Sequence, residues 1–169
     1  MTRGLSLSCL ALGALACQGS PRMMTSADST AIVAEGRAFM ESYVKDLLAG
    51  DAKALAARYD TTGAWLVGNG TTEFASLDSI RADYHAVAST PPISFEWRDL
   101  SYEPISRDAI VVVGRFTSAL PGTPPATLSY VVLLRRQGTG LRIRVEDESM
   151  DPRQIPMPAA HPDSVKTGG

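Results

Sequence analysis

Residues 141–149, LRIRVEDES, alternate between apolar and charged side chains and then break that alternation. Side chains along a β-strand point to opposite faces in turn, so Leu141, Ile143 and Val145 predict one apolar face. The next residue on that face is Asp147, whose carboxylate would follow three aliphatic side chains toward a core. An isolated buried charge is very costly, so this carboxylate needs a partner or a proton. The stretch therefore predicts a strand with a candidate site at its end.

The preceding predicted strand, residues 126–136 (ATLSYVVLLRR), sets the register of this stretch through the turn QGTG at residues 137–140. If Arg136 faces Leu141, apolar residues lie opposite apolar residues, which is typical of a correct register. The same register predicts three further pairs: Leu134 with Ile143, Val132 with Val145, and Tyr130 with Asp147. The hairpin before it, closed around residues 121–125, is predicted to pair Phe116 with Tyr130 and Val112 with Leu134. The inner surface should therefore become aromatic and polar at Phe116, Tyr130 and Asp147.

The first half of the chain predicts three helices. Apolar residues recur at steps of three and four between Ala31 and Ala49, as on the buried side of an amphipathic helix. Gly50 is expected to end this helix, and Asp51 to cap a shorter one over residues 51–59. A short strand at residues 64–67 (AWLV) and a turn at residues 69–74 (NGTTEF) then precede a third helix over residues 76–89, capped by Ser76.

The second half predicts strands only, over residues 93–103, 109–120, 126–136 and 141–150. In the first of them, the apolar residues change parity between Trp97 and Leu100. This change predicts a β-bulge near Arg98 and Asp99, which would bend the sheet. Three helices followed by a four-stranded antiparallel meander are an α+β pattern, in which a curved sheet wraps around the helices.

The order of these elements, the helix junction AGDAKALAARYD (residues 49–60) and the final strand LRIRVEDES together resemble the SnoaL-like branch of the nuclear transport factor 2-like superfamily. The resemblance covers residues 31–150 and implies a cone-shaped, cystatin-like fold whose wide end holds a pocket. Isomerases and cyclases of this superfamily use a pocket carboxylate, in some cases with a phenol beside it. The chain departs from the family pattern at Leu141, where Trp is frequent, and at Asp147, where many relatives have His.

The resemblance places Asp147 on the pocket wall beside the phenol of Tyr130. One interpretation is structural, with Asp147 at the wet mouth of the cone or hydrogen-bonded to Tyr130; the other makes it a ligand anchor or a general base. Six other aromatic residues are pocket candidates, although their spacing is equally typical of a core: Tyr43, Tyr59, Trp65, Tyr84, Trp97 and Phe116. His85 is expected at the edge of its helix, exposed to solvent.

Both ends of the chain are predicted to lie outside the folded domain. Residues 1–16 have one Arg followed by an apolar run too short to span a bilayer, which predicts a signal peptide. The residues GALA before Cys17 resemble a lipobox, so Cys17 is expected to carry lipid; the alternative is ordinary cleavage that leaves a free thiol. Residues 17–30 are then a flexible tether and residues 151–169, with four prolines, a disordered tail. By resemblance to bacterial lipoproteins, Gln18 after the Cys implies the outer membrane, facing the periplasm.

The composition argues against several classes of protein. The chain has 16 basic and 18 acidic residues, a net charge of −2, and lacks the concentrated positive charge of nucleic-acid-binding proteins. Only two histidines, His85 and His161, are present, and no phosphate-binding glycine loop is found, so neither a metal nor a cofactor is predicted. The outer sheet face carries an apolar patch rimmed by charge, which predicts a homodimer: Val111, Val113, Val131 and Leu133.

Three functions remain open. The first is a lipid-anchored domain of the cell envelope that holds a small apolar ligand or a protein partner without catalysis. The second is an isomerase- or cyclase-type enzyme with Asp147 as general base, since a fold alone does not establish a function. The third is a structural lipoprotein that meets a partner through its sheet face or its proline-rich tail.

Overall fold

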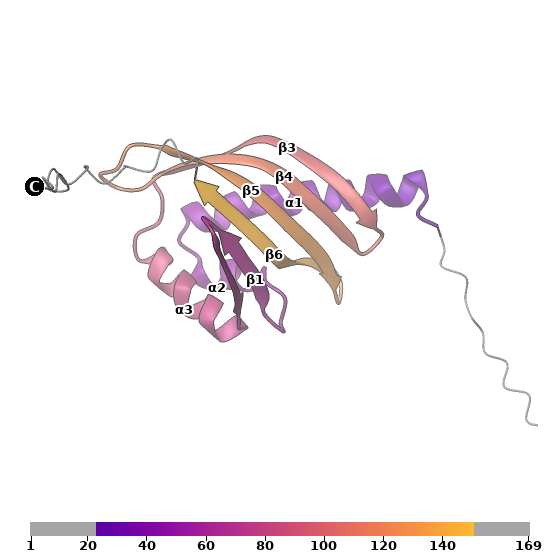
Figure 1. Cartoon of the computed structure of the whole chain (residues 1–169), viewed down its shortest axis with the longest axis horizontal. Helices are drawn as coiled ribbons and strands as arrows, with labels where there is room; N and C mark the ends of the chain where they lie inside the picture. The colour runs from indigo at the N-terminus through magenta and orange to yellow at the C-terminus, as the bar shows by residue number, and fades with distance from the viewer. Residues whose placement is uncertain (1–22, 151–169) are drawn as a thin grey trace, which may run out of the picture.

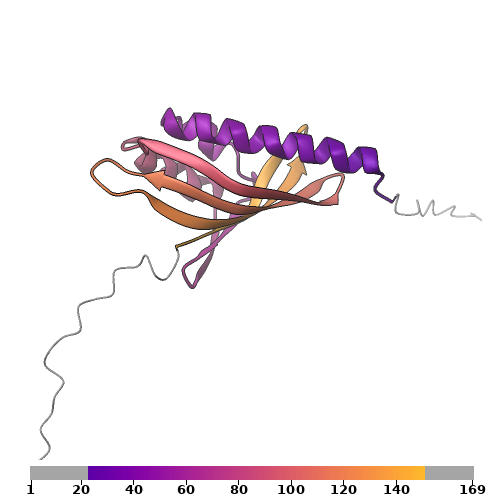
Figure 2. The same cartoon turned by 90° about the horizontal axis from the view of Figure 1, so that it is seen from above.

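The computed structural model describes residues 23–150, in which three helices pack on one face of a curved six-stranded sheet (Figures 1 and 2). The helices are α1 (Ser26–Leu48), α2 (Ala52–Ala56) and α3 (Leu77–Ala88). The strands are β1 (Ala64–Gly68), β2 (Thr71–Ala75), β3 (Ser94–Ser106), β4 (Ala109–Ala119), β5 (Ala126–Gln137) and β6 (Gly140–Met150). The predicted α+β class and curved sheet are confirmed.

The sheet has the order β2-β1-β6-β5-β4-β3 and is mixed, because β1 runs parallel to β6. The four long strands form the predicted antiparallel meander. Strand β2 was not predicted, since residues 69–74 were interpreted as a turn. The turn itself is only Asn69 and Gly70, both with positive φ, and Asn-Gly is the strongest short signal for a two-residue hairpin. The sequence therefore contained the signal for this additional strand.

Helix α1 begins five residues earlier than predicted. Thr25 and Asp28 form a capping box, in which the Thr25 side chain accepts from the backbone N–H of Asp28 and the Asp28 side chain accepts from that of Thr25. The predicted tether over residues 17–30 is therefore wrong for residues 26–30, which are helical. The signal peptide, Cys17 and the tail over residues 151–169 lie outside the described residues.

The end of α1 and the starts of α2 and α3 follow their capping residues as predicted, whereas α2 ends at Ala56, before the predicted residue 59. Gly50 has φ +65°, a conformation that favours glycine, and follows the last turn of α1. Asp51 accepts a hydrogen bond from the backbone of Ala54 at the start of α2, and Ser76 accepts one from Ser79 at the start of α3. In the described part of the chain, no helix has the length and apolar character needed to cross a membrane.

The core lies between α1 and the inner face of the long strands (Figure 2). Buried residues of α1 recur at helical spacing: Ile32, Gly36, Met40, Tyr43 and Leu47. Gly36 lets the helix approach the sheet closely, because a Cβ at this position would already touch Ile110 and Tyr102 at 3.4 Å. This close approach packs α1 against β3 and β4.

The predicted bulge in β3 is confirmed. The pairing of β3 with β4 shifts between Arg98 and Ser101, and Asp99 has φ +54°. Gly114 lies across from this irregularity, where a Cβ would come within 2.9 Å of the Arg98 carbonyl oxygen. The bulge bends β3, and its ion pair between Asp99 and Arg115 lies on the solvent side.

A second bulge, which was not predicted, lies in β6. The pairs Arg136–Leu141 and Leu134–Ile143 are as predicted, but the next pair is Leu133 with Val145. One additional residue, Arg144, is accommodated there, and its guanidinium donates to the Gly63 carbonyl oxygen at 2.7 Å. The predicted pairs Val132–Val145 and Tyr130–Asp147 are therefore wrong, because a one-residue slip moves every following side chain to the other face.

The predicted register between β4 and β5 is also wrong, by two residues. Phe116 pairs with Leu128 and Val112 with Val132, because the strands separate already at Ser118. The connection is thus longer than the predicted turn. A two-residue shift preserves the face of each side chain, so Phe116 and Val112 still point inward and are buried.

Candidate functional site

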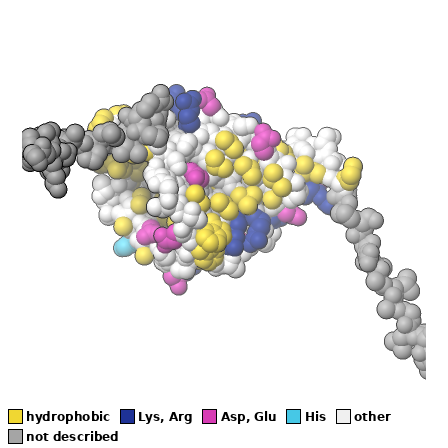
Figure 3. Space-filling model, viewed as in Figure 1, with side chains coloured by type: hydrophobic (Ala, Val, Ile, Leu, Met, Phe, Trp, Pro, Cys, Tyr) yellow, Lys and Arg dark blue, Asp and Glu magenta, His cyan; other side chains and the backbone are white. Residues whose placement is uncertain are grey.

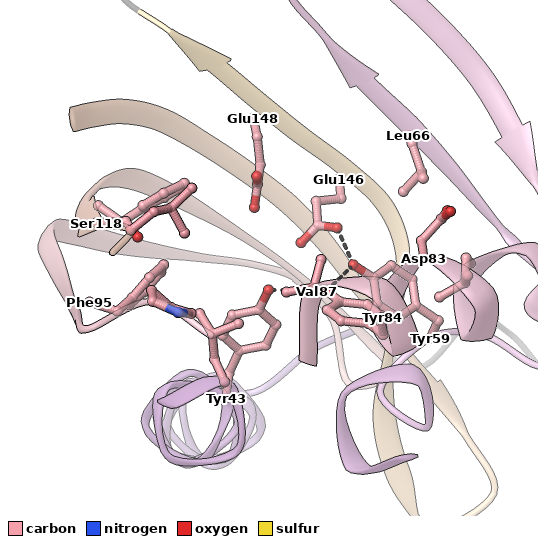
Figure 4. A pocket seen from close by; sticks show the side chains of 15 residues that line it. Tyr43, Tyr59, Leu66, Asp83, Tyr84, Val87, Phe95, Ser118, Glu146 and Glu148 are labelled. Carbon is pink, nitrogen blue, oxygen red and sulfur yellow. Dashed lines mark hydrogen bonds between the residues drawn. The ribbon is translucent and has the colours of Figure 1, made fainter. Parts of the chain in front are cut away.

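A cavity of about 300 Å³ opens between α3 and the inner face of the sheet (Figure 4). Its walls come from α1, the segment after α2, α3, β1, β3, β4 and β6. Most of the lining is aromatic or aliphatic, and the carboxyl groups of Glu146 and Glu148 project into it from β6 (Figure 4). The cavity therefore combines an apolar body with a small acidic region.

Glu146 is the buried carboxyl group of this region, with 6% of its surface exposed. It accepts hydrogen bonds from the hydroxyls of Tyr130, at 2.7 Å, and Tyr59. The Tyr59 oxygen lies 2.8 Å from the hydroxyl of Tyr84, which lies 3.1 Å from that of Tyr43. Each phenol has one proton, so donation from Tyr59 to Glu146 makes Tyr84 donate to Tyr59 and Tyr43 donate to Tyr84.

Protonation at this site is governed by burial. Burial raises the pKa of Glu146, although the hydrogen bonds from Tyr59 and Tyr130 lower it in part. Burial also raises the pKa of the phenols of Tyr43, Tyr59 and Tyr130 well above the ordinary value, and nearby carboxylates raise it further. The phenols therefore remain protonated donors at any physiological pH.

Glu148 lies two residues after Glu146 on the same side of β6 and points into the cavity (Figure 4). Burial, followed by the charges of Glu146 and Asp147, raises the pKa of Glu148 to about 8. No hydrogen bond or ion pair within residues 23–150 reaches its carboxyl group. Glu148 is thus a partly buried acid that is free to meet a ligand.

The predicted pocket residues divide into two groups. The cavity is lined by Tyr43, Tyr59, Tyr84 and Phe116. Tyr130 does not line it but donates a hydrogen bond to Glu146, which does. Trp97 packs in the aromatic core, and its indole N–H donates to the Met40 carbonyl oxygen at 3.0 Å. Trp65 lies on the outer face of the sheet against Phe74 and is 42% exposed. His85 is exposed, as predicted.

Asp147 does not face the cavity, so its predicted role as pocket carboxylate is wrong. It pairs with Val131 across the strands and accepts a hydrogen bond from Ser149 at 2.9 Å. The bulge at Arg144 is the physical reason, since it places Glu146 and Glu148 inside and Asp147 outside. Sequence reasoning therefore missed Glu146 and Glu148. Their signal was the run EDE, in which a single extra residue decides which carboxylates point inward.

Known proteins resemble the chain in structure but not in sequence. No family model and no curated protein matches it. A protein of unknown function from Shewanella oneidensis, described as NTF-2 like, superposes with a TM-score of 0.62 at 16% identity, over 70% of this chain and 98% of the other. The fold is that of nuclear transport factor 2-like proteins.

Two further structures with the nuclear transport factor 2-like fold have enzyme names. A putative scytalone dehydratase from Novosphingobium aromaticivorans has a TM-score of 0.62 at 10% identity, covering 75% of this chain and 89% of the other. A putative ketosteroid isomerase from Parabacteroides distasonis has a TM-score of 0.55 at 18% identity, covering 67% of this chain and 86% of the other. At these identities the similarity establishes the fold alone. Within residues 23–150, no group of His, Cys, Asp or Glu side chains is arranged to hold a metal ion.

Proposed function

We propose that the cavity binds a small, mainly apolar ligand and holds its polar end at Glu148 and at the network of phenols around Glu146. The observation that supports this function is the cavity itself: an apolar hollow of about 300 Å³ with convergent polar groups at one side. Ligand sites typically have this composition and volumes of about 300–1,000 Å³. The cavity lies at the lower end of that range, which suits a ligand the size of a bicyclic aromatic compound.

A second candidate function is proton transfer, for which the supporting observation is the carboxyl group of Glu148, which points into the apolar cavity without a partner among residues 23–150. A general acid or base works best when its pKa lies near the operating pH, and burial brings that of Glu148 to about 8. Incorporation of solvent deuterium into α-tetralone, followed by mass spectrometry, would separate this function from binding alone: a rate lost in Glu148→Gln supports it, and no incorporation rejects it for simple ketones.

The proposed setting of this activity is the cell envelope. Cys17 and the segment before it lie outside the described residues, and the proposal is based on their sequence alone: a short apolar run followed by a lipobox-like GALAC. Mass spectrometry of the protein from a bacterial membrane fraction would test it. An acylated N-terminal Cys17 supports the anchor, whereas an intact residue 1 or a free thiol at Cys17 contradicts it.

The ligand site can be tested by filling the cavity. Val87 lines the cavity from α3 yet is 43% exposed, so Val87→Trp should place an indole at the mouth without disturbing the core. His85→Trp is the matched control, because it adds the same group to an exposed position of the same helix outside the cavity lining. Isothermal titration with neutral and charged indole compounds should show binding to wild type and to His85→Trp, with affinity at least tenfold weaker in Val87→Trp.

Two results would contradict the proposed function. The first is the absence of binding by every indole compound in the wild-type chain. The second is an affinity that does not change in Val87→Trp, since the ligand would then bind elsewhere on the molecule.

A further inference from the structure

The charged residues that line the cavity all have the same sign. Asp83 projects from α3, and Glu146 and Glu148 project from β6 (Figure 4). None of the 15 lining residues is Lys, Arg or His. A cavity built for a carboxylate or phosphate ligand needs donors with positive charge. This lining therefore disfavours an anionic ligand.

Three basic side chains of β6 and of neighbouring parts of the chain are held elsewhere. Arg58 pairs with Asp46 and also donates to Ser42, and Arg135 pairs with the buried carboxylate of Asp60. Arg144 donates to the Gly63 carbonyl oxygen. Within residues 23–150, no ion pair includes Glu146 or Glu148. The acidic region of the cavity thus has no counter-ion among the described residues.

The walls around the acidic region are aromatic. Five aromatic residues line the cavity: Tyr43, Tyr59, Tyr84, Phe95 and Phe116. The face of an aromatic ring attracts a cation through its negative electrostatic potential, and the attraction increases when water is excluded. Carboxylates framed by aromatic rings form the environment that recognises ammonium groups. The same rings also accept the apolar part of a ligand.

We propose that the ligand is an organic cation, an amine whose apolar body fills the aromatic cavity and whose ammonium group meets the carboxylate of Glu148. This inference rests on the proposed function of the cavity and specifies its ligand class. An ammonium group at this position supplies a counter-ion and donates charge-assisted hydrogen bonds to the carboxylate of Glu148. A neutral ligand of the same shape gains only the apolar contacts.

Affinity for such a cation should increase with pH. Glu148 must be ionised to pair with it, and its pKa of about 8 leaves it largely protonated at pH 6. The groups that face or adjoin Glu148 are Glu146 and Asp147 on β6, Tyr130 on β5, Tyr43 on α1, and Asp83 and Tyr84 on α3. The carboxylates hold the proton on Glu148, and the phenols remain neutral throughout this range, so Glu148 governs the dependence.

Three indole compounds that differ only in their polar end test the proposal: tryptamine, tryptophol and indole-3-acetate. They carry an ammonium, a hydroxyl and a carboxylate at neutral pH, and 2-phenylethylamine and 2-phenylethanol form a smaller matched pair. Isothermal titration with the full-length chain at pH 8 should give at least tenfold tighter binding of each amine than of its alcohol. Indole-3-acetate should bind most weakly, and tryptamine should bind more tightly at pH 8.5 than at pH 6.5.

Two variants test whether the preference for amines over alcohols depends on Glu148. Glu148→Gln should reduce the ratio of tryptamine affinity to tryptophol affinity by about tenfold, because it removes the charge at constant size. Asp147→Asn is the matched control, since it removes the same charge one residue away on the opposite face of β6. Because the charge of Asp147 helps to raise the pKa of Glu148, this variant should keep the ratio or increase it, and should not reduce it. Equal reduction in both variants would overturn the proposal by showing a general electrostatic effect.

The outcomes separate this inference from the function on which it rests. Binding of the alcohols as tightly as the amines, lost in Val87→Trp, overturns the cation proposal and leaves the ligand-binding function in place. Tighter binding of indole-3-acetate than of tryptamine would also overturn the cation proposal and leave the ligand-binding function in place. Binding of none of the five compounds overturns both.

Discussion

Glu146 is a buried carboxylate whose position depends on the two phenols that donate to it. Tyr130 is fully buried, and its hydroxyl is 2.7 Å from the Glu146 carboxyl group. Hydrogen bonds to charged groups contribute about 1.5–3 kcal/mol, and removal of one partner leaves the other inadequately satisfied. The stability of the site at the residue scale is therefore concentrated in a few polar contacts.

Replacement of Tyr130 by Phe should lower the free energy of unfolding by about 2 kcal/mol, because Glu146 loses one of two donors. Chemical denaturation at pH 7 measures this loss. Tyr102→Phe is the control, since its partly buried hydroxyl lies outside the network. Equal losses in the two variants would contradict the structural role given to the Tyr130 hydroxyl.

Asp60 should make the fold sensitive to acid. Burial alone would raise its pKa, but hydrogen bonds from Thr62 and the charge of Arg135 outweigh this and hold the pKa at about 2. A lowered folded-state pKa means that the stabilisation is present above the unfolded value of 3.8 and is lost as pH falls toward 2. The contribution is on the order of 2 kcal/mol.

The measurement is the free energy of unfolding of wild type and Asp60→Asn between pH 2 and pH 6. The difference between them should be largest above pH 5 and should shrink on acidification through the interval from 3.8 to about 2. A difference that does not change with pH would show that the carboxylate charge of Asp60 is irrelevant to stability.

At the scale of secondary structure, β6 shows where sequence patterns stop being informative. The alternation over residues 141–145 correctly predicted the strand and its first two pairs. The bulge at Arg144 depends on contacts with the chain around Gly63 and with β1, which lie far away in the sequence. A local pattern contains no information about such contacts, so the inward carboxylates were assigned to the wrong residue.

The capping residues of the helices were more predictable because their action is local. Asp51 and Ser76 cap their helices through their own side chains, and Gly50 supplies the required backbone conformation. The bulge in β3 was visible as a change of parity between Trp97 and Leu100. By contrast, the parallel pairing of β1 with β6 is tertiary and had no local signal.

The start of α1 offers a test at this scale. Thr25→Ala removes the acceptor for the N–H of Asp28 and should lower the free energy of unfolding by about 1 kcal/mol. Thr25→Ser retains the hydroxyl and should therefore retain most of the free energy of unfolding that Thr25→Ala loses. If Thr25→Ala is as stable as wild type in urea denaturation, residues 26–30 do not contribute a capped helical turn in solution.

The whole molecule presents an apolar outer sheet face opposite the helices. Figure 3 shows apolar side chains gathered on this face, with Lys and Arg beside them. Among the large apolar residues exposed there are Trp65, Phe74, Val113 and Val131, each at 40–44%. Patches of this kind rimmed by charge commonly mark an interface. We propose that two copies of the chain associate through it.

Sedimentation velocity of the full-length chain should then show a dimer at micromolar concentration. Val131→Glu places a charge in the middle of the face and should shift the equilibrium to monomer. Ile93→Glu is the control, because Ile93 is 68% exposed, directly precedes β3 and is not one of the patch residues. A wild-type chain that sediments as a monomer would contradict the proposed dimer.

The central claim is that carboxyl groups of β6 lie inside an apolar cavity. Carbon-13 NMR titration of the glutamate carboxyl groups, with Glu148 assigned by comparison with Glu148→Gln, measures this directly. The structure predicts a Glu148 titration midpoint of about 8, because burial and the neighbouring carboxylates disfavour its ionised form. A midpoint near the ordinary value of 4.5 would place the Glu148 carboxyl group in water and would contradict the site described here.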